Sequence, residues 1–172
     1  MFDIYKSNEK DTARFLLGTS CEPSIIVVGL NPSTASKEVS DTTASKVRKA
    51  AKNAGYNGFI MTNLYPLRST DPKKLPVACD VELLQKNIRE IEQAASNGLP
   101  PIFWAAWGSD ITLRPYLKQA LLQLNGVVLK LNGKWVQFGS LTQKNHPRHP
   151  SRLAYAWQFK EFDIATYLST AI

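Results

Sequence analysis

The sequence predicts an α/β fold with a central, mainly parallel four-stranded sheet. Two observations predict it. Short apolar runs, typical of strands buried on both faces, alternate along the chain with segments of helical periodicity. The first such run, Ile25–Val28, ends at Gly29, which allows the chain to turn tightly away from a sheet. A length of 172 residues with 44% hydrophobic residues predicts one domain, residues 1–172, with a full core.

Four apolar segments are the candidate sheet strands, at residues 25–30, 58–63, 102–107 and 127–131. Asn132-Gly133 is a strong two-residue hairpin signal, so residues 134–138 are expected to pair back on the fourth strand. Residues 12–17 fit either a short helix or an edge strand.

Helices are expected at residues 43–54, 80–96, 111–124 and 152–168, where apolar side chains recur at helical spacing. Asp41 or Thr42 suits the N-cap of the first helix, and Gly55 suits the position just after its end. Pro100-Pro101 prevents the second helix from continuing.

The net charge of +7 favours a polyanionic partner, with nucleic acid first, although basic residues also serve ordinary solubility. The two cysteines cannot form a disulfide framework or hold a structural zinc alone. No apolar run is long enough for a membrane helix, and the first residues do not resemble a signal peptide. We therefore expect a cytoplasmic monomer with no cofactor and no membrane partner.

Two predicted strands deliver asparagines to one edge of the sheet. Asn31 follows the strand at 25–30, and Asn63 ends the strand at 58–63. Ligands of open α/β sheets bind at the carboxyl ends of the strands, and the Asn carboxamide has both a donor and an acceptor for a nucleobase edge. Either side chain could instead serve only its own turn.

Both histidines lie in one stretch, residues 143–152, and each precedes a proline. A positioned His149 could donate to a developing oxyanion, and Arg148 and Arg152 could contact phosphate. His146 and His149 could also bind a metal, but two histidines supply too few ligands, so no metal site is expected.

Three short motifs resemble those of the uracil-DNA glycosylase superfamily. Residues 29–33, Gly-Leu-Asn-Pro-Ser, are similar to the first motif of its mismatch-specific members, and residues 60–64 to its base-reading strand. His149-Pro150-Ser151 matches its last motif. The motifs at residues 30–33, 63–68 and 147–150 also resemble a family of bacterial and phage proteins known as DUF1643. This similarity is the closer one and covers residues 12–160, but the family name gives no activity. The superfamily resemblance implies a three-layer α/β/α sandwich.

The same resemblance implies residue roles. Asn31 would position the attacking water, Asn63 would bind the flipped base, and His149 would stabilise charge on the departing base. Arg148 and Arg152 would bind phosphate or hold the duplex open. Further candidates for substrate binding are Gly29, Leu30, Pro32, Ser33 and Tyr65, and further candidates for nucleic-acid binding are Ser151, Arg68, Lys46 and Lys49.

One departure from the superfamily concerns the base pocket. The aromatic that should follow the first motif is missing from residues 39–43, which suggests a base other than uracil. Asp41, in the same segment, could be the general base, with Asn31 structural.

Three functions remain open on the sequence. The first is a DNA glycosylase-like hydrolase that flips and excises a damaged or modified base, as in DNA repair. The second is a nucleic-acid-binding module that keeps this fold without catalysis. The third is a hydrolase or transferase acting on small nucleotides.

Overall fold

The computed structural model describes residues 2–172, which form one mixed seven-stranded sheet in the order β1-β2-β4-β3-β5-β6-β7. Strands β4, β3, β5 and β6 are parallel, and β1, β2 and β7 extend the sheet at its two sides in antiparallel pairing. The strands are β1 (Ile4–Ser7), β2 (Arg14–Thr19), β3 (Ser24–Gly29), β4 (Gly58–Asn63), β5 (Ile102–Ala105), β6 (Lys134–Phe138) and β7 (Phe159–Glu161).

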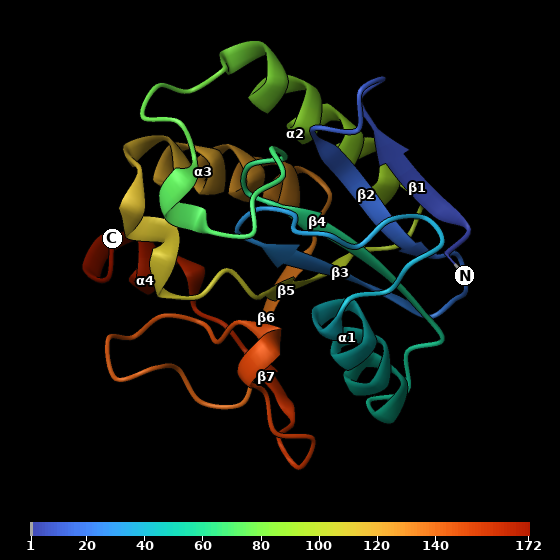
Figure 1. The fold of residues 1–172 in the computed structure, drawn as a ribbon. Coiled ribbons are helices and arrows are strands. Elements are labelled where there is room, and N and C mark those ends of the chain that lie inside the picture. The colour runs from blue at the N-terminus through green and yellow to red at the C-terminus, as the bar shows by residue number, and fades with distance from the viewer. Residues whose placement is uncertain (1) are drawn as a thin grey trace.

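Helices cover both faces of this sheet (Figure 1). One face packs against α1 (Thr42–Asn53), and the other against α2 (Val81–Ala95), α3 (Pro115–Lys130) and the short α4 (Ile164–Thr170). Three 3₁₀ turns lie in the connections: η1 (Pro72–Lys74), η2 (Ser109–Leu113) and η3 (Pro150–Arg152).

The central strand β3 shows why the chain folds this way. Its side chains alternate between the two faces, so Val27 packs on the α1 side and Val28 on the α2/α3 side. Both faces are covered, so the strand is continuously apolar. Helix α1 begins where the sequence predicts, because the Asp41 carboxylate accepts a 2.8 Å hydrogen bond from the Ala44 amide.

The prediction of a four-stranded, mainly parallel sheet is correct for three strands, which are β3, β4 and β5, whereas the fourth parallel strand is β6 and not residues 127–131. Residues 12–17, whose sequence fits either a short helix or an edge strand, mostly belong to β2. Strand β2 is not at the edge, because β1 pairs on its outer side and β4 on its inner side. The antiparallel additions escaped prediction because β1 and β7 are only four and three residues long.

The predicted strand at residues 127–131 and its hairpin with residues 134–138 are wrong. Residues 127–130 are the last turn of α3, and Val127 and Val128 are buried among the apolar side chains of that face. Asn132 turns the chain with a positive φ of 53°, and β6 then pairs in parallel with β5. Burial of two valines on a helix face overrides their preference for strands.

The predicted helix at residues 152–168 is also wrong in most of its length. Residues 159–161 form β7 on the edge of the sheet, and the helix begins only at Ile164, where the Asp163 carboxylate caps it. No helix found within residues 2–172 combines the length and the apolar character needed to cross a membrane.

Candidate functional site

A cleft of about 600 Å³ opens at the carboxyl ends of the parallel strands. The segment after each of the four parallel strands contributes to its wall, and α1 adds Thr43 from its first turn. The lining residues include Leu30, Asn31, Ser33, Ser69, Trp107, Gly108, Asp110, Thr142, Arg148, His149, Ser151 and Arg152. This edge of an open α/β sheet is where ligands ordinarily bind.

Asn31 lies in this cleft and joins two of its segments. Its side-chain Nδ2 donates to the backbone carbonyls of Ser69, at 2.8 Å, and Pro32, at 3.2 Å. The amide donor is therefore committed to holding the segment after β3 against the segment after β4. The Oδ1 atom is the part of Asn31 that can accept a hydrogen bond from a ligand or a water.

His149 lines the same cleft, and its ring is oriented by the next turn. The Ser151 backbone N–H and hydroxyl lie 3.3 and 2.8 Å from Nδ1, which therefore accepts. Burial lowers the pKa of His149, and Asp41 and Asp110 oppose that shift only in part. The ring is thus neutral near pH 7 and carries its proton on Nε2.

Gly108 makes the turn beside His149 in a conformation that favours glycine. Its φ of 72° and ψ of −166° belong to a backbone region that is almost restricted to glycine. A Cβ at this position would lie 3.5 Å from the Cβ of His149, so the two backbones approach closely. Gly108 thereby lets the segment after β5 pass directly beside His149.

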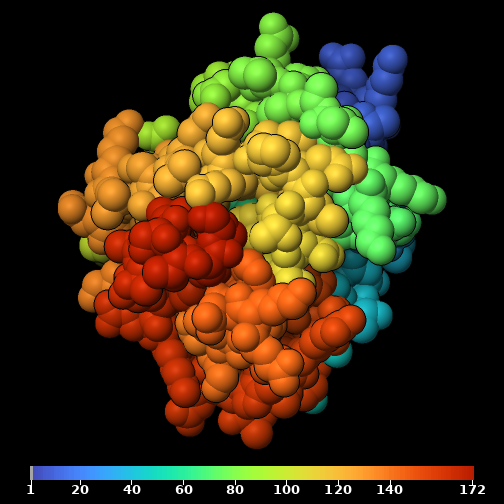
Figure 2. Space-filling model, turned by 90° about the vertical axis from the view of Figure 1, so that its left-hand side faces the viewer, coloured from blue at the N-terminus to red at the C-terminus, as the bar shows by residue number. Residues whose placement is uncertain are grey.

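Trp107 supplies an aromatic wall that the sequence did not reveal. It is almost fully buried, yet part of it reaches the cleft, and its Nε1 donates to the Tyr167 hydroxyl of α4 at 3.0 Å. The same hydroxyl lies 2.9 Å from Nδ1 of His146. His146 is therefore a buried structural residue behind the cleft, and Figure 2 shows the red C-terminal segment packed between the yellow and orange segments that carry these partners.

The basic residues predicted to bind nucleic acid divide into those at or beside the cleft and Arg68, which lies elsewhere. Arg148 and Arg152 line the cleft. Lys46 donates to the Ser151 carbonyl beside the cleft, and Lys49 lies over the Tyr155 ring. Arg68 belongs to the interior: it donates to the Ser33 and Ala35 carbonyls and pairs with Asp11.

Asn63 and Tyr65 are not among the residues that line the cleft. Asn63 is 5% exposed, and its Nδ2 makes no hydrogen bond within residues 2–172. Its carboxamide lies over Gly29, where a Cβ would come within 2.6 Å of Oδ1. Tyr65 is buried and accepts a hydrogen bond from the Asp80 amide. Gly29 and Pro32 likewise shape the turn from outside the cleft lining.

The segment between β3 and α1 is fixed by two arginines. The guanidinium groups of Arg14 and Arg68 both donate to the Ala35 carbonyl, at 2.8 and 3.0 Å. Arg14 is almost completely buried, and this burial, with the charge of Arg68, lowers its pKa to about 10. Ala35 packs in the same apolar cluster as the α1 face of the sheet, which includes Met61 of β4. The arginines therefore set the position of the cleft residue Ser33.

Asp41 does not line the cleft, because its carboxylate caps α1. The carboxylate that does line it is Asp110, in the turn after β5. The sequence signal for Asp110 is its position in the turn that follows the expected strand at residues 102–107, which is the kind of signal that singles out Asn31. Among residues 2–172, no three His, Cys, Asp or Glu side chains are grouped so that they could hold a metal ion.

Comparison with known proteins gives a family match and no individual relative. Residues 14–151 match a family model described as "Protein of unknown function (DUF1643)". No curated protein and no solved structure matches the chain.

Proposed function

The chain belongs to the DUF1643 family, and we propose that its cleft hydrolyses the N-glycosidic bond of a damaged or modified nucleotide in DNA. The observation that carries the proposal is the convergence of Asn31 and His149 on one cleft, although they lie far apart in the sequence. Both are residues to which the motif resemblance assigns chemistry. The cleft volume of about 600 Å³ is in the range of small-molecule sites.

In this reaction the bond between the base and the sugar carbon breaks, and its electron pair leaves with the base. Water adds to the sugar carbon, and the proton that the water loses compensates the charge on the base or passes to solvent. His149 supports the first half of the step. A neutral imidazole with its proton on Nε2 can donate to an oxygen of the base that gains negative charge.

Asn31 supports the second half. Its Nδ2 is held by the Ser69 carbonyl, so Oδ1 has a fixed position and can accept a hydrogen bond from the attacking water. An amide orients water but takes no proton. Asp110 is the carboxylate that lines the same cleft. It is better placed to accept the proton of the water than Asp41, whose carboxylate caps a helix.

A small-nucleotide substrate is the second candidate, because two of the side chains expected to contact DNA donate hydrogen bonds to carbonyls of the protein itself. Arg68 donates to loop carbonyls, and Lys46 donates to the Ser151 carbonyl. These donors favour a ligand smaller than a duplex. A binding module without catalysis is the third candidate.

One assay separates these candidates. The purified protein is incubated with single- and double-stranded oligonucleotides that each carry one modified base, and with the corresponding free nucleotides, and the released base is measured by liquid chromatography and mass spectrometry. We expect release from an oligonucleotide by the wild-type protein and loss of release in His149→Ala. Release from free nucleotides alone identifies the second candidate, and no release from any substrate rejects hydrolysis.

A further inference from the structure

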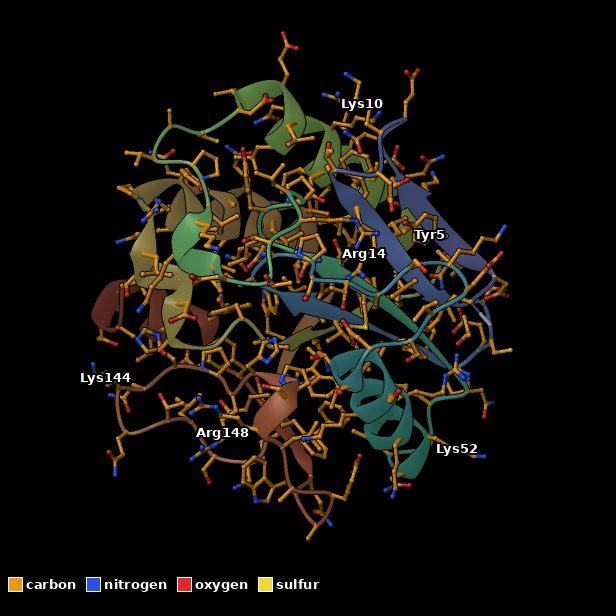
Figure 3. The ribbon with its side chains drawn as sticks, viewed as in Figure 1. Tyr5, Lys10, Arg14, Lys52, Lys144 and Arg148 are labelled. Atoms are coloured by element: carbon orange, nitrogen blue, oxygen red, sulfur yellow. The ribbon has the colours of Figure 1, made fainter. Side chains whose placement is uncertain are left out.

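The positive charge of the protein is concentrated in two segments. Helix α1 and residues 139–160 together contain eight Lys and Arg and no Asp or Glu, whereas the rest of the chain has thirteen bases and fourteen acids. The two segments are in contact, because Lys46 of α1 donates to the Ser151 carbonyl. Figure 3 places Lys144, Arg148 and Lys52 along the lower side of the molecule, with Lys10 at the opposite end. Asp41 and Glu161 flank these segments.

A groove of about 400 Å³ lies between the same two segments. Its walls are aromatic rings and small uncharged side chains, and no Lys, Arg, Asp or Glu lines it. The rings are Tyr56, Phe138, Tyr155, Trp157 and Phe159. An aromatic groove between two segments whose charged residues are all basic suits the flat face of a nucleobase attached to a charged backbone.

A cationic side chain lies over each of two of these rings. Lys49 Nζ lies 4.3 Å from the centre of the Tyr155 ring, and the Arg148 guanidinium lies 5.0 Å from that of Trp157. Trp157 is also packed on Gly139, where a Cβ would come within 2.6 Å of the indole, so this ring is held in place. Tyr155 is 40% exposed, more than any other aromatic residue from 2 to 172, and is the ring available to a ligand.

Arg148 joins the groove to the cleft. It lines the cleft, lies over Trp157, and is oriented by a 2.8 Å hydrogen bond from Nε to the Ser140 carbonyl. Arg152 lines the cleft three residues before Tyr155. A ligand that filled both depressions would therefore pass along Arg148 and Arg152.

We propose that this groove binds the base of a nucleotide adjacent to the one in the cleft, and that the ligand is a single-stranded nucleic acid. Tyr155 stacks on the neighbouring base, while Lys49, Arg148 and Arg152 contact the phosphates. A duplex does not present base faces to such a ring, and a mononucleotide cannot reach both depressions. The inference rests on the proposed function for the occupant of the cleft.

The test is fluorescence anisotropy with labelled oligodeoxythymidylate and oligouridylate, a blunt DNA duplex, and thymidine monophosphate as competitor. We expect a single strand to bind more tightly than the duplex, and the monophosphate to compete poorly. Tyr155→Ala should weaken binding about 5- to 100-fold, the usual effect of removing one stacked base contact. Tyr155→Phe keeps the ring and should bind with the affinity of the wild-type protein. Leu122→Ala, which changes an exposed apolar residue on α3, is the control and should leave binding unchanged.

The salt dependence tests the charges. Each lost phosphate contact should reduce the slope of log affinity against log salt by about 0.7, so Lys49→Ala should lower the slope and Lys10→Ala should not. A preference for the uridylate strand assigns the ligand to RNA.

Unchanged binding in Tyr155→Ala, or tighter binding of the duplex, overturns the inference. Binding is measured without turnover, so strand binding without base release retains the groove and rejects hydrolysis. Base release from free nucleotides without strand binding retains hydrolysis and rejects the groove as a binding site for a neighbouring base.

Discussion

The indole Nε1 of Trp107 donates a hydrogen bond to the Tyr167 hydroxyl over 3.0 Å, and this contact ties the wall of the cleft to the C-terminal helix. Burial raises the pKa of Tyr167 to about 12, so its hydroxyl keeps its proton and can donate to Nδ1 of His146, 2.9 Å away. The three side chains form a buried chain of hydrogen bonds behind the cleft. Its members come from the segment after β5, from α4 and from the loop after β6, so it fixes these parts of the chain to one another.

Tyr167→Phe should therefore destabilise the protein. The substitution leaves the Trp107 N–H and His146 Nδ1 without a partner in an apolar environment, which costs about 1–3 kcal/mol in the free energy of unfolding. Urea denaturation followed by tryptophan fluorescence measures this. Tyr5→Phe is the matched control, because the two partners of its hydroxyl, the Asp11 carboxylate and the Arg68 guanidinium, also pair with each other, and its effect should stay below about 1 kcal/mol. Equal effects of the two substitutions would contradict the role of the buried chain.

The two histidines predict how stability depends on pH. Burial lowers the pKa of both His146 and His149 below the ordinary value of 6.5, so between the lowered and the ordinary pKa the unfolded chain binds more protons than the folded one. The free energy of unfolding should then fall as pH decreases through 6.5 towards 5. The lowered pKa values of Asp3, Asp11 and Asp163 start from 3.8 and act only at more acidic pH.

Urea midpoints at pH 8, 7, 6 and 5 measure this dependence. His149→Gln removes one of the two titrating groups, so it should reduce the loss of stability between pH 7 and 5. A stability that rises on acidification over this range would show that the histidines are charged in the folded protein.

Gly108→Ala tests the close approach to His149. The glycine has φ 72° and ψ −166°, and placing an alanine there should cost about 1–3 kcal/mol in the free energy of unfolding. The added Cβ meets the Cβ of His149 at an ordinary contact distance of 3.5 Å, so the cost comes from the backbone and not from a clash.

Gly126→Ala is the control for that substitution. Gly126 lies within α3, a Cβ there meets nothing within 4 Å, and the change should stabilise the protein by about 0.5–1 kcal/mol. Thermal denaturation of both variants measures the contrast. A neutral effect of Gly108→Ala would mean that the segment after β5 can relax without cost.

Three strands of the parallel centre, β3, β4 and β5, could be predicted because their signals are local. The apolar run at 25–28 and the strand at 58–63 stand next to their turns in the sequence, and the carboxyl-end rule then brings Asn31 and His149 into one cleft. Val127 and Val128 misled the prediction because strand-forming residues can also serve a buried helix face. Their burial depends on how α3 packs on the sheet, which no local pattern records.

The burial of Asn63 could not be predicted either. Asn63 lies over Gly29 of β3, and Asn87 of α2 donates to its backbone carbonyl, so its surroundings come from separate parts of the chain. Arg68 and Asn63 are present in the motifs at the expected positions, but sequence spacing does not tell whether a donor faces a ligand or a neighbouring carbonyl. Trp107 was missed for a related reason, since its contact with Tyr167 joins residues 60 positions apart.

The chemical roles of the cleft residues are tested last, by single-turnover base release from the substrate that the oligonucleotide panel identifies. His149→Ala should lower the rate about 10²- to 10³-fold, the usual cost of losing one donor to a developing oxyanion, with little loss of binding. Asn31→Ala and Asp110→Ala separate the positioning of water from the removal of its proton. Loss of a general base costs about 10²- to 10⁴-fold and shifts the pH profile, whereas loss of a water-orienting amide leaves the profile unchanged.

Asp41→Ala is the comparison that decides between the two carboxylates. Because Asp41 caps α1, its loss should reduce the free energy of unfolding by about 0.5–2 kcal/mol. It should lower the rate less than Asp110→Ala does. A larger rate loss in Asp41→Ala than in Asp110→Ala would transfer the role of base to Asp41, and full activity in both Asn31→Ala and His149→Ala would reject the proposed hydrolysis mechanism.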